Sequence, residues 1–205
     1  ELVDIRGVAR IAREAGALVF VDNVFATPIL QNPLQLGADV VMYSATKHID
    51  GQGRALGGAI LGPADYIGGP VKNLMRHTGP ALSPFNAFMI LTGVETLPLR
   101  MQKHSDNALA IAEHLSNHDA VKWVSYPGLP GDRYHNLAKK YCPKGAGAVF
   151  TFGLKGGYDA GLALVKNLKL FSHLANVGDT RSLVIHPAST THRQLSDAQK
   201  IVAGA

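Results

Sequence analysis

The sequence contains a single cysteine and no long apolar run. Cys142 is alone among 205 residues, so no disulfide can form within one chain. A reducing compartment is then the default, and we expect a cytoplasmic protein in which Cys142 is packed structurally rather than used in redox or nucleophilic chemistry. No apolar run approaches the roughly 18 residues that a membrane-spanning helix needs, so we expect no membrane partner.

Charge is also sparse. Charged residues make up 17% of the chain, and the net charge of +5 comes from lysines and arginines that form no basic run. Nucleic-acid binding needs a concentrated basic patch, so we expect no nucleic-acid partner. Hydrophobic residues account for 46% of the chain. This composition and length predict a folded globular protein with one large core or two smaller ones.

The sequence begins with a helical pattern and ends without a closing element. The segment ELVDIRGVARIAREAG is typical of a helix that stops at Gly16, with one apolar face made of Leu2, Ile5, Val8, Ala9 and Ala12. The last segment, QLSDAQKIVAGA, has no closing element after it. We therefore expect a chain that starts inside a larger protein and is truncated at both ends.

Strands and helices alternate through the first half. The runs ALVFVDN, ADVVMYS and GGAILG are typical of strands, and the first two of strands buried on both faces of a parallel sheet. PLQLG predicts a short helical turn, and residues 64–76 predict a helix. This order indicates an α/β layer with a mainly parallel sheet.

A long helical stretch follows from Ser83, which with Pro84 makes a cap and first-turn signal. We expect Pro98 to kink or divide this helix. Beyond Val121 the predicted elements form a smaller α+β unit: strand VKWVSYPG, helix YHNLAKKY, strand GAVFTFGL, helix YDAGLALVKNL and strand SLVIHP. We expect two domains, residues 1–110 and 111–205.

Polar side chains follow the first two predicted strands. Asp22 comes after the first strand, and Ser44, Thr46 and Lys47 come after the second. In open α/β sheets ligands bind at the carboxyl ends of the strands. Asp22 and Lys47 at neighbouring strand ends are compatible either with a structural ion pair or with a cofactor site.

Pyridoxal phosphate needs an amine for a Schiff base, a carboxylate for its pyridine nitrogen and donors for its phosphate. Lys47, next to small residues in a partly dry pocket, would be favoured as a neutral, nucleophilic amine. Ser44 and Thr46 alternate with a small residue and would present two hydroxyls to a phosphate. Gly51 lets the backbone pass close to a cofactor or a neighbouring chain. SATK alone is a weak signal, and VFVDN earlier in the chain strengthens it.

The segment from VFVDN to GGAILG resembles the cofactor-binding core of the Cys/Met-metabolism family of pyridoxal-phosphate (PLP) enzymes, and the resemblance runs through essentially the whole chain. It implies the type I aminotransferase-like fold, with a partial large domain and a smaller α+β C-terminal domain. It also implies that Asp22 contacts the pyridine nitrogen, that Ser44 and Thr46 bind the phosphate, and that Lys47 is both the Schiff-base residue and the acid/base.

Asn176 in the segment ANVGD matches a position that helps to hold the substrate carboxylate in this family. A turn residue beside Gly178 is the alternative. His186 and His192 lie six residues apart without a third ligand at zinc-like spacing, so we expect no metal site.

Two branches of the family compete. The half through RHTGPALSPFNAFMILTGVETLPLR, with its short spacing from Lys47 to Ser83, is similar to O-succinylhomoserine sulfhydrylases. The half with LAKKYCPKGAGAVFTFGLKGGYDAG is similar to O-acetylhomoserine sulfhydrylases. Both imply γ-replacement of the acyl group by sulfide, which gives homocysteine for methionine biosynthesis. The alternatives are a cystathionine γ-synthase or γ-lyase of the same family, and a truncated scaffold without catalysis.

The resemblance also implies that the protein forms oligomers and that two family segments are missing from this sequence. Sites in this family lie between subunits, so we expect a homo-oligomer, a dimer or a tetramer. Family members have an upstream part with a ring-stacking tyrosine, and a downstream RLSVGIE-like segment whose arginine binds the substrate carboxylate. Because the sequence lacks both, we expect the chain alone to bind PLP weakly and to turn over poorly.

Overall fold

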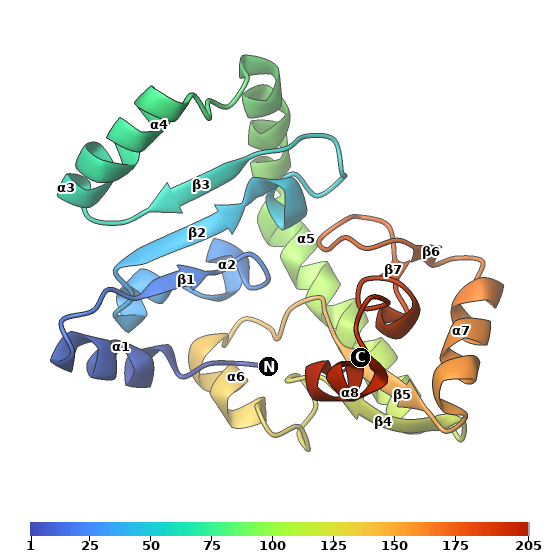
Figure 1. Cartoon of the computed structure of the whole chain (residues 1–205). Coiled ribbons are helices and arrows are strands. Elements are labelled where there is room, and N and C mark those ends of the chain that lie inside the picture. Colours follow the sequence, from blue (N-terminus) through green and yellow to red (C-terminus); the bar gives the residue numbers. More distant parts are fainter. Residues whose placement is uncertain (205) are drawn as a thin grey trace.

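The computed structural model describes residues 1–204. A three-stranded sheet lies on one side of the molecule, and a long helix, α5 (Pro84–Ser116), runs from it to a second group of short strands and helices (Figure 1). The strands of the first sheet are ordered β1 (Phe20–Asp22), β2 (Val40–Ser44) and β3 (Gly58–Leu61). Helix α1 (Ile5–Glu14) packs on one face of this sheet, where apolar side chains are buried: Ile5, Ala9, Val19, Val41 and Tyr43.

The third strand differs from the expected mainly parallel sheet. β1 pairs with β2 in parallel, with Asp22 opposite Met42, whereas β2 pairs with β3 antiparallel, with Ser44 opposite Gly58. A parallel return normally needs a crossover helix that covers the sheet. Residues 45–57 form a tight turn and a loop instead, so the chain comes back along β2 in the opposite direction.

The predicted burial on both faces is wrong for β1 and holds for β2 only where the strand begins, because Val40 and Val41, which point to opposite faces, are each 1% exposed. The face with Val41 packs against α1, but on the other face Phe20 is 52% exposed, Met42 43% and Ile60 48%. This second face is covered at Val40 and at its edge, where the Phe20 ring meets Tyr66 with ring centroids 5.9 Å apart. An apolar strand sequence is compatible with burial, but only a covering layer produces it.

The expected short helices are present. The turn predicted at PLQLG is the 3₁₀ helix η1 (Pro33–Leu36), which ends at Gly37 with a positive φ of 104°. A further short helix, α2 (Thr27–Leu30), precedes it and was not predicted. The helix predicted over residues 64–76 is present as three consecutive pieces: α3 (Ala64–Tyr66), the π-helical η3 (Ile67–Val71) and α4 (Lys72–Thr78).

Helix α5 begins as the sequence predicts, because the Ser83 hydroxyl accepts a hydrogen bond from the Asn86 amide at 3.1 Å. Pro98 lies inside the helix and does not divide it. Its missing N–H removes one intrahelical bond. Leu97 and Met101, on either side of Pro98, are both buried in one cluster with Leu30, so packing holds the helix across the gap.

The second group of elements matches the predicted α+β unit. β4 (Val121–Ser125) and β5 (Thr151–Leu154) pair antiparallel, and Tyr126 is buried against Ala108 and Ala112 of α5. The other elements are α6 (His135–Tyr141), α7 (Gly157–Asn167), the parallel pair β6 (Ser172–His173) and β7 (Leu183–Val184), η4 (Pro187–Ser189) and α8 (Asp197–Ala203). The division between residues 110 and 111 would fall inside α5 and stays a prediction. Within residues 1–204 no helix combines the length and apolar character of a membrane span.

Candidate functional site

The Lys47 turn, residues 45–51, follows β2 directly. It contains the π-type turn η2 (Ala45–Ile49), in which the Asp50 amide donates to the Ala45 carbonyl at 2.9 Å. Lys47 itself has non-helical backbone angles, φ −91° and ψ −124°. Its side chain is half-buried, and Nζ donates to Oδ1 of Asn176 at 3.3 Å. The structure thus brings together two predicted site residues that are 129 positions apart in the sequence.

The segment that carries Asn176 packs directly on the Lys47 turn. The Thr180 amide donates to the Gly51 carbonyl at 2.9 Å. Gly178 has a φ of +79°, and a Cβ placed there would lie 2.5 Å from atoms of His48. A glycine at position 178 is therefore needed for the segment to pack against His48. Asn176, two residues before it, is brought to Lys47 by the same packing.

Asp22 and Ser44 lie at the ends of β1 and β2. Asp22 is exposed, and its Oδ1 accepts from the Val24 amide at 3.1 Å. It makes no ion pair with Lys47, which excludes the structural-pair alternative in this structure. Ser44 is half-buried, and within residues 1–204 its hydroxyl makes no hydrogen bond. Both groups are free for a ligand.

Thr46 differs from the expectation that its hydroxyl is free to face a phosphate. Its Oγ1 lies 3.3 Å from the Gly57 carbonyl, to which it donates, and accepts from the Gly57 amide at 3.1 Å. Gly57 immediately precedes β3, so this bond exists because β3 returns antiparallel to β2. Thr46 ties the two ends of the loop together.

Arg100 on α5 is a residue of the site that the sequence did not point to. Its guanidinium donates to the carbonyls of His48 at 2.6 Å, Ile49 at 3.2 Å and Gly93 at 2.7 Å. An arginine inside a helical pattern is usually a solvated charge, so nothing local distinguished it. Burial lowers the pKa of Arg100 from its usual value.

Asp50 ends the Lys47 turn with a fully buried side chain. It accepts from the amides of Gln52 and Arg54, at 3.2 and 2.8 Å, and from Arg54 Nε at 3.0 Å. Burial alone would raise the pKa of Asp50, but these hydrogen bonds and the charge of Arg54 lower it below its usual value. Asp50 is therefore a charged anchor of the loop that follows Lys47.

A buried histidine pair lies behind the turn. The rings of His48 and His104 meet edge to face with centroids 5.9 Å apart, and His48 Nδ1 lies 3.1 Å from the Val24 carbonyl. Burial lowers the pKa of His48 to about 4, and the charges of His104 and Arg100 act in the same direction. Within residues 1–204, Nε2 of neither ring has a hydrogen-bond partner. His48 is therefore neutral at pH 7.

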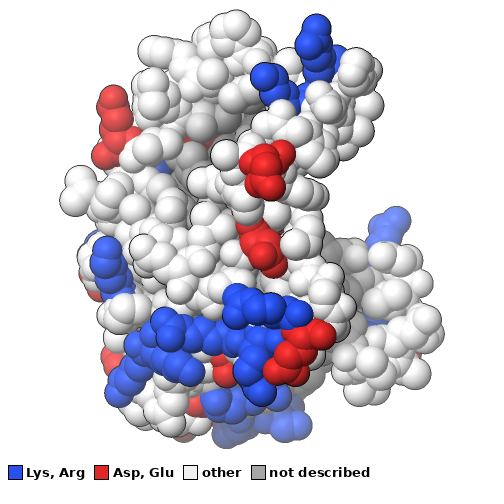
Figure 2. Space-filling model, turned by 90° about the vertical axis from the view of Figure 1, so that its left-hand side faces the viewer, with Lys and Arg blue, Asp and Glu red and all other residues white. Residues whose placement is uncertain are grey.

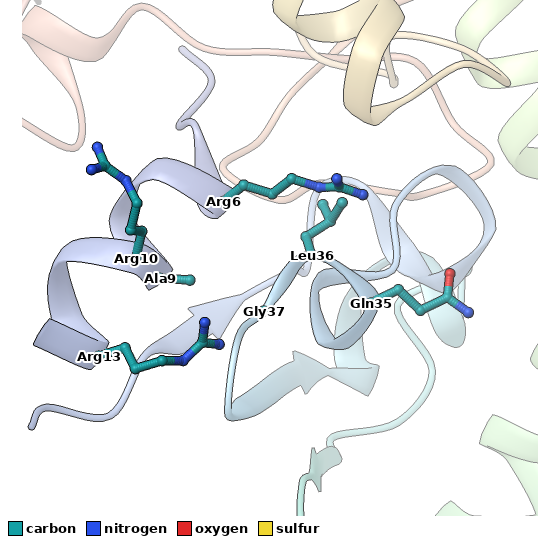
Figure 3. A pocket seen from close by; sticks show the side chains of 7 residues that line it. All are labelled: Arg6, Ala9, Arg10, Arg13, Gln35, Leu36 and Gly37. Carbon is teal, nitrogen blue, oxygen red and sulfur yellow. The ribbon is translucent and has the colours of Figure 1, made fainter.

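Away from the Lys47 turn, an open groove of about 300 Å³ lies between α1 and η1 (Figure 3). It is lined by Arg6, Ala9, Arg10, Arg13, Gln35, Leu36 and Gly37. Figure 2 shows Lys and Arg side chains gathered low on this side of the molecule. None of the predicted site residues lines the groove, so the chemistry at the Lys47 turn, not the groove, marks the candidate active site.

Cys142 is packed as the sequence predicted. The thiol is buried and lies 3.7 Å from the Gln31 side-chain nitrogen. Burial raises the pKa of Cys142 to about 11, so the thiol is protonated and unreactive at neutral pH.

A profile described as "Cys/Met metabolism PLP-dependent enzyme" matches residues 1–205. The chain belongs to this family. It is 50% identical over 207 residues to an O-succinylhomoserine sulfhydrylase of Mycobacterium tuberculosis, covering 99% of this chain and 51% of the relative. It is 41% identical over 244 residues to an O-acetyl-L-homoserine sulfhydrylase of Leptospira meyeri, covering 100% of this chain and 55% of the relative. The chain thus spans about half the length of these relatives.

Solved structures of PLP enzymes share the fold. A cystathionine gamma synthase from Xanthomonas oryzae pv. oryzae, in complex with aminoacrylate and cysteine, matches 100% of this chain and 52% of its own, with a TM-score of 0.93 and 39% identity. An O-acetylhomoserine (thiol)-lyase from Campylobacter jejuni, which contains a pyridoxyl-lysine phosphate group, matches 100% of this chain and 56% of its own, with a TM-score of 0.91 and 35% identity. The chain therefore has part of the type I aminotransferase-like PLP fold, which confirms the predicted fold class.

The donor set at the Lys47 turn fits the cofactor of this family. Lys47 supplies an amine, Asp22 an exposed carboxylate and Ser44 a hydroxyl with no hydrogen-bond partner among the described residues 1–204. All three lie at the carboxyl ends of β1 and β2, the edge at which open α/β sheets bind ligands.

Proposed function

We propose that this chain carries the cofactor lysine of a PLP-dependent O-acyl-homoserine sulfhydrylase. The reaction replaces the acyl group on Cγ of O-succinyl- or O-acetyl-homoserine with sulfide and gives homocysteine for methionine biosynthesis. The observation that supports this most directly is the contact between Lys47 Nζ and Asn176 at the edge of the sheet, in a chain of this family.

PLP, when bound, supplies an electron sink next to the substrate α-carbon. Lys47 would hold the cofactor through Nζ and, once released, accept and return a proton at the same atom. The Asp22 carboxylate would keep the pyridine nitrogen protonated. Ser44 would donate to the phosphate, and Thr46 would do so only by turning its proton away from Gly57.

Asn176 suits a second role at the same site. Its Oδ1 accepts from Lys47, so both N–H donors of its amide remain for a substrate carboxylate. We propose that Asn176 keeps the Lys47 amine and the substrate carboxylate on the same side of the site.

For the acyl donor we favour the succinyl ester. The relatives at 50% and 48% identity are O-succinylhomoserine sulfhydrylases, and they align over 207 and 204 residues. The alignment with the O-acetyl enzyme of Leptospira meyeri extends over 244 residues, more than this chain has, so that relative contains inserted residues. The second candidate reaction is cystathionine synthesis, which the similarity to the Xanthomonas enzyme supports.

The remaining expectations concern the whole protein. We propose that it assembles into a homo-oligomer, a dimer or a tetramer, and acts in the cytoplasm on small-molecule substrates. Residues 1–205 alone would turn over poorly, because the tyrosine and arginine segments expected of the family are not in this sequence.

The first experiment adds PLP to the purified chain, reduces the mixture with borohydride and maps the modified lysines. Because we expect weak binding, the adduct at Lys47 should approach one per chain only at high PLP concentration. It should be lost in Lys47→Arg and retained in Lys103→Arg, a matched change at an exposed position. Equal labelling of many lysines, unchanged in Lys47→Arg, would identify a scaffold without a cofactor site. With the adduct established, sulfide and cysteine as alternative acceptors separate the two candidate reactions.

A further inference from the structure

Arg100 is a half-buried arginine whose hydrogen bonds within residues 1–204 all go to uncharged acceptors. Its three carbonyl partners are those of His48, Ile49 and Gly93, and its Nε donates to Thr96 Oγ1 at 3.0 Å. Within residues 1–204 no carboxylate lies within 4.0 Å of the guanidinium. Hydrogen bonds from a charged donor are roughly twice as strong as neutral ones. Arg100 therefore acts as a bridge between two backbone segments rather than as half of an ion pair.

The Lys47 turn has two carbonyls that it cannot satisfy by itself. The Ala45 carbonyl accepts from the Asp50 amide at 2.9 Å, and the Lys47 carbonyl accepts from the Gly51 amide at 2.8 Å. The carbonyls of His48 and Ile49 come next and have no partner within the turn, as at any helix C-terminus. The guanidinium of Arg100 satisfies both of them.

Two glycines make room for this contact. A Cβ at Gly93 would lie 2.3 Å from the Ile49 carbonyl oxygen, and a Cβ at Gly51 would lie 2.3 Å from Arg100 Nη1. Gly51 also has a φ of +75°. The space that the sequence suggested for a cofactor beside Gly51 is thus occupied by Arg100. The backbone of α5 at Gly93 therefore lies directly against the backbone of the Lys47 turn at Ile49, and the Arg100 guanidinium lies beside this contact and bonds to the turn.

We propose that Arg100 is a positioning residue that fixes the direction of the Lys47 amine by holding the carbonyl end of its turn against α5. A second contact holds the turn, since the Thr180 amide donates to the Gly51 carbonyl, and Lys47 Nζ reaches Asn176 in the same segment as Thr180. Without Arg100 the turn keeps its bonds to Thr180, Gly57 and Val24 but is no longer tied to α5, and Nζ is then less firmly directed at Asn176. The catalytic consequence rests on the proposed function of Lys47, whereas the structural consequence does not.

A lysine at position 100 could replace only part of the hydrogen bonding of the guanidinium. An ammonium is a single point of charge, while the planar fork of arginine reaches acceptors in two directions at once. Arg100→Lys should therefore keep part of the anchoring, and Arg100→Met should lose it while filling a similar volume. Lys103→Met, on the same helix and exposed, is the matched control.

The test measures the reactivity of Lys47 without cofactor. Each protein is trace-labelled with acetic anhydride over a range of pH, and the acetylated lysines are mapped, while hydrogen exchange is followed in the peptide of residues 44–54. In Arg100→Met we expect Lys47 to react about tenfold faster, because the turn loses both of its hydrogen bonds to a charged donor. The 44–54 peptide should exchange faster, and Arg100→Lys should be intermediate. The other lysines, the far-UV circular dichroism and Lys103→Met should match the wild type.

Two outcomes would overturn the role of Arg100. One is wild-type acetylation of Lys47 and wild-type exchange of residues 44–54 in Arg100→Met. The other is faster exchange throughout the protein, which a general loss of stability would produce. PLP and borohydride labelling of the same variants separates the two proposals: a wild type without selective Lys47 labelling contradicts the proposed function and leaves the cofactor-free result on Arg100 standing.

Discussion

His48 shows how burial sets the charge of single residues around the Lys47 turn. Its side chain is 1% exposed, the ring of His104 and the charge of Arg100 are nearby, and no carboxylate bonds to it. Asp179, also buried, keeps its charge because Arg181 bonds to both of its oxygens, at 3.1 and 2.8 Å. The site is thus surrounded by neutral histidines and paired carboxylates, and acid should disturb the histidines first.

We predict that the free energy of unfolding falls as the pH drops from about 6.5 to about 4. A histidine in the unfolded chain has a pKa near 6.5, whereas that of folded His48 is about 4. Between these values the unfolded state binds more protons, so the stability is fully present above pH 6.5 and is lost toward pH 4. The difference corresponds to roughly 3 kcal/mol at most. The lowered pKa values of His104 and His186 act in the same direction.

Urea unfolding at pH 7 and pH 4.5 measures this loss. His48→Gln should flatten the pH dependence, and His77→Gln, at an exposed position, should leave it as in the wild type. An equal fall in stability for His48→Gln and the wild type would show that other groups cause it.

At the scale of elements, the contact between α5 and the Lys47 turn is the feature on which the proposed positioning of the amine rests. The helix is formed by local signals, since Ser83 caps it and its apolar residues repeat at helical spacing. Its position against the turn depends instead on long-range contacts, among them that of Gly93, which is buried and lies against the Ile49 carbonyl.

Gly93→Ala should therefore lower the free energy of unfolding by about 1–3 kcal/mol, the range for an overpacked contact. In a free helix the same change would stabilise by up to about 1 kcal/mol, so a loss of stability would itself indicate the close contact. Gly68→Ala in η3 is the control, because no atom lies within 4 Å of a Cβ there. Urea denaturation measures the free energy of unfolding of both variants. An unchanged free energy of unfolding in Gly93→Ala would show that the contact adjusts without cost.

At the scale of the whole molecule, the uncovered face of the first sheet is the main feature. Phe20, Met42 and Ile60 are each about half exposed and lie on neighbouring strands. Monomeric proteins rarely leave contiguous apolar faces in water, and such faces usually mark contacts with other chains or domains.

We predict that the isolated chain self-associates through this face. Sedimentation velocity should show a species larger than the 21.8 kDa monomer whose share rises with concentration. Ile60→Lys should shift the distribution toward monomer, because a charge would be buried in the contact. Leu170→Lys, at a residue that is 81% exposed and outside the sheet, is the matched control. Association unchanged by Ile60→Lys would place the contact on another surface.

The sequence by itself determined most of the elements, the fold class and the place of Lys47 after its strand. Helical periodicity, the Ser83 cap and apolar runs are local signals, and Lys47 and Asp22 follow their strands directly, so their positions at the sheet edge needed only the alternation of strands and helices. The tertiary structure decided what no local pattern encodes: the antiparallel return of β3 that engages Thr46, the uncovered face of the sheet, the approach of Asn176 to Lys47 and the bridge made by Arg100. These features depend on contacts between segments far apart in the chain, or on whether another layer covers the sheet. Only the packing of the whole chain decides such contacts.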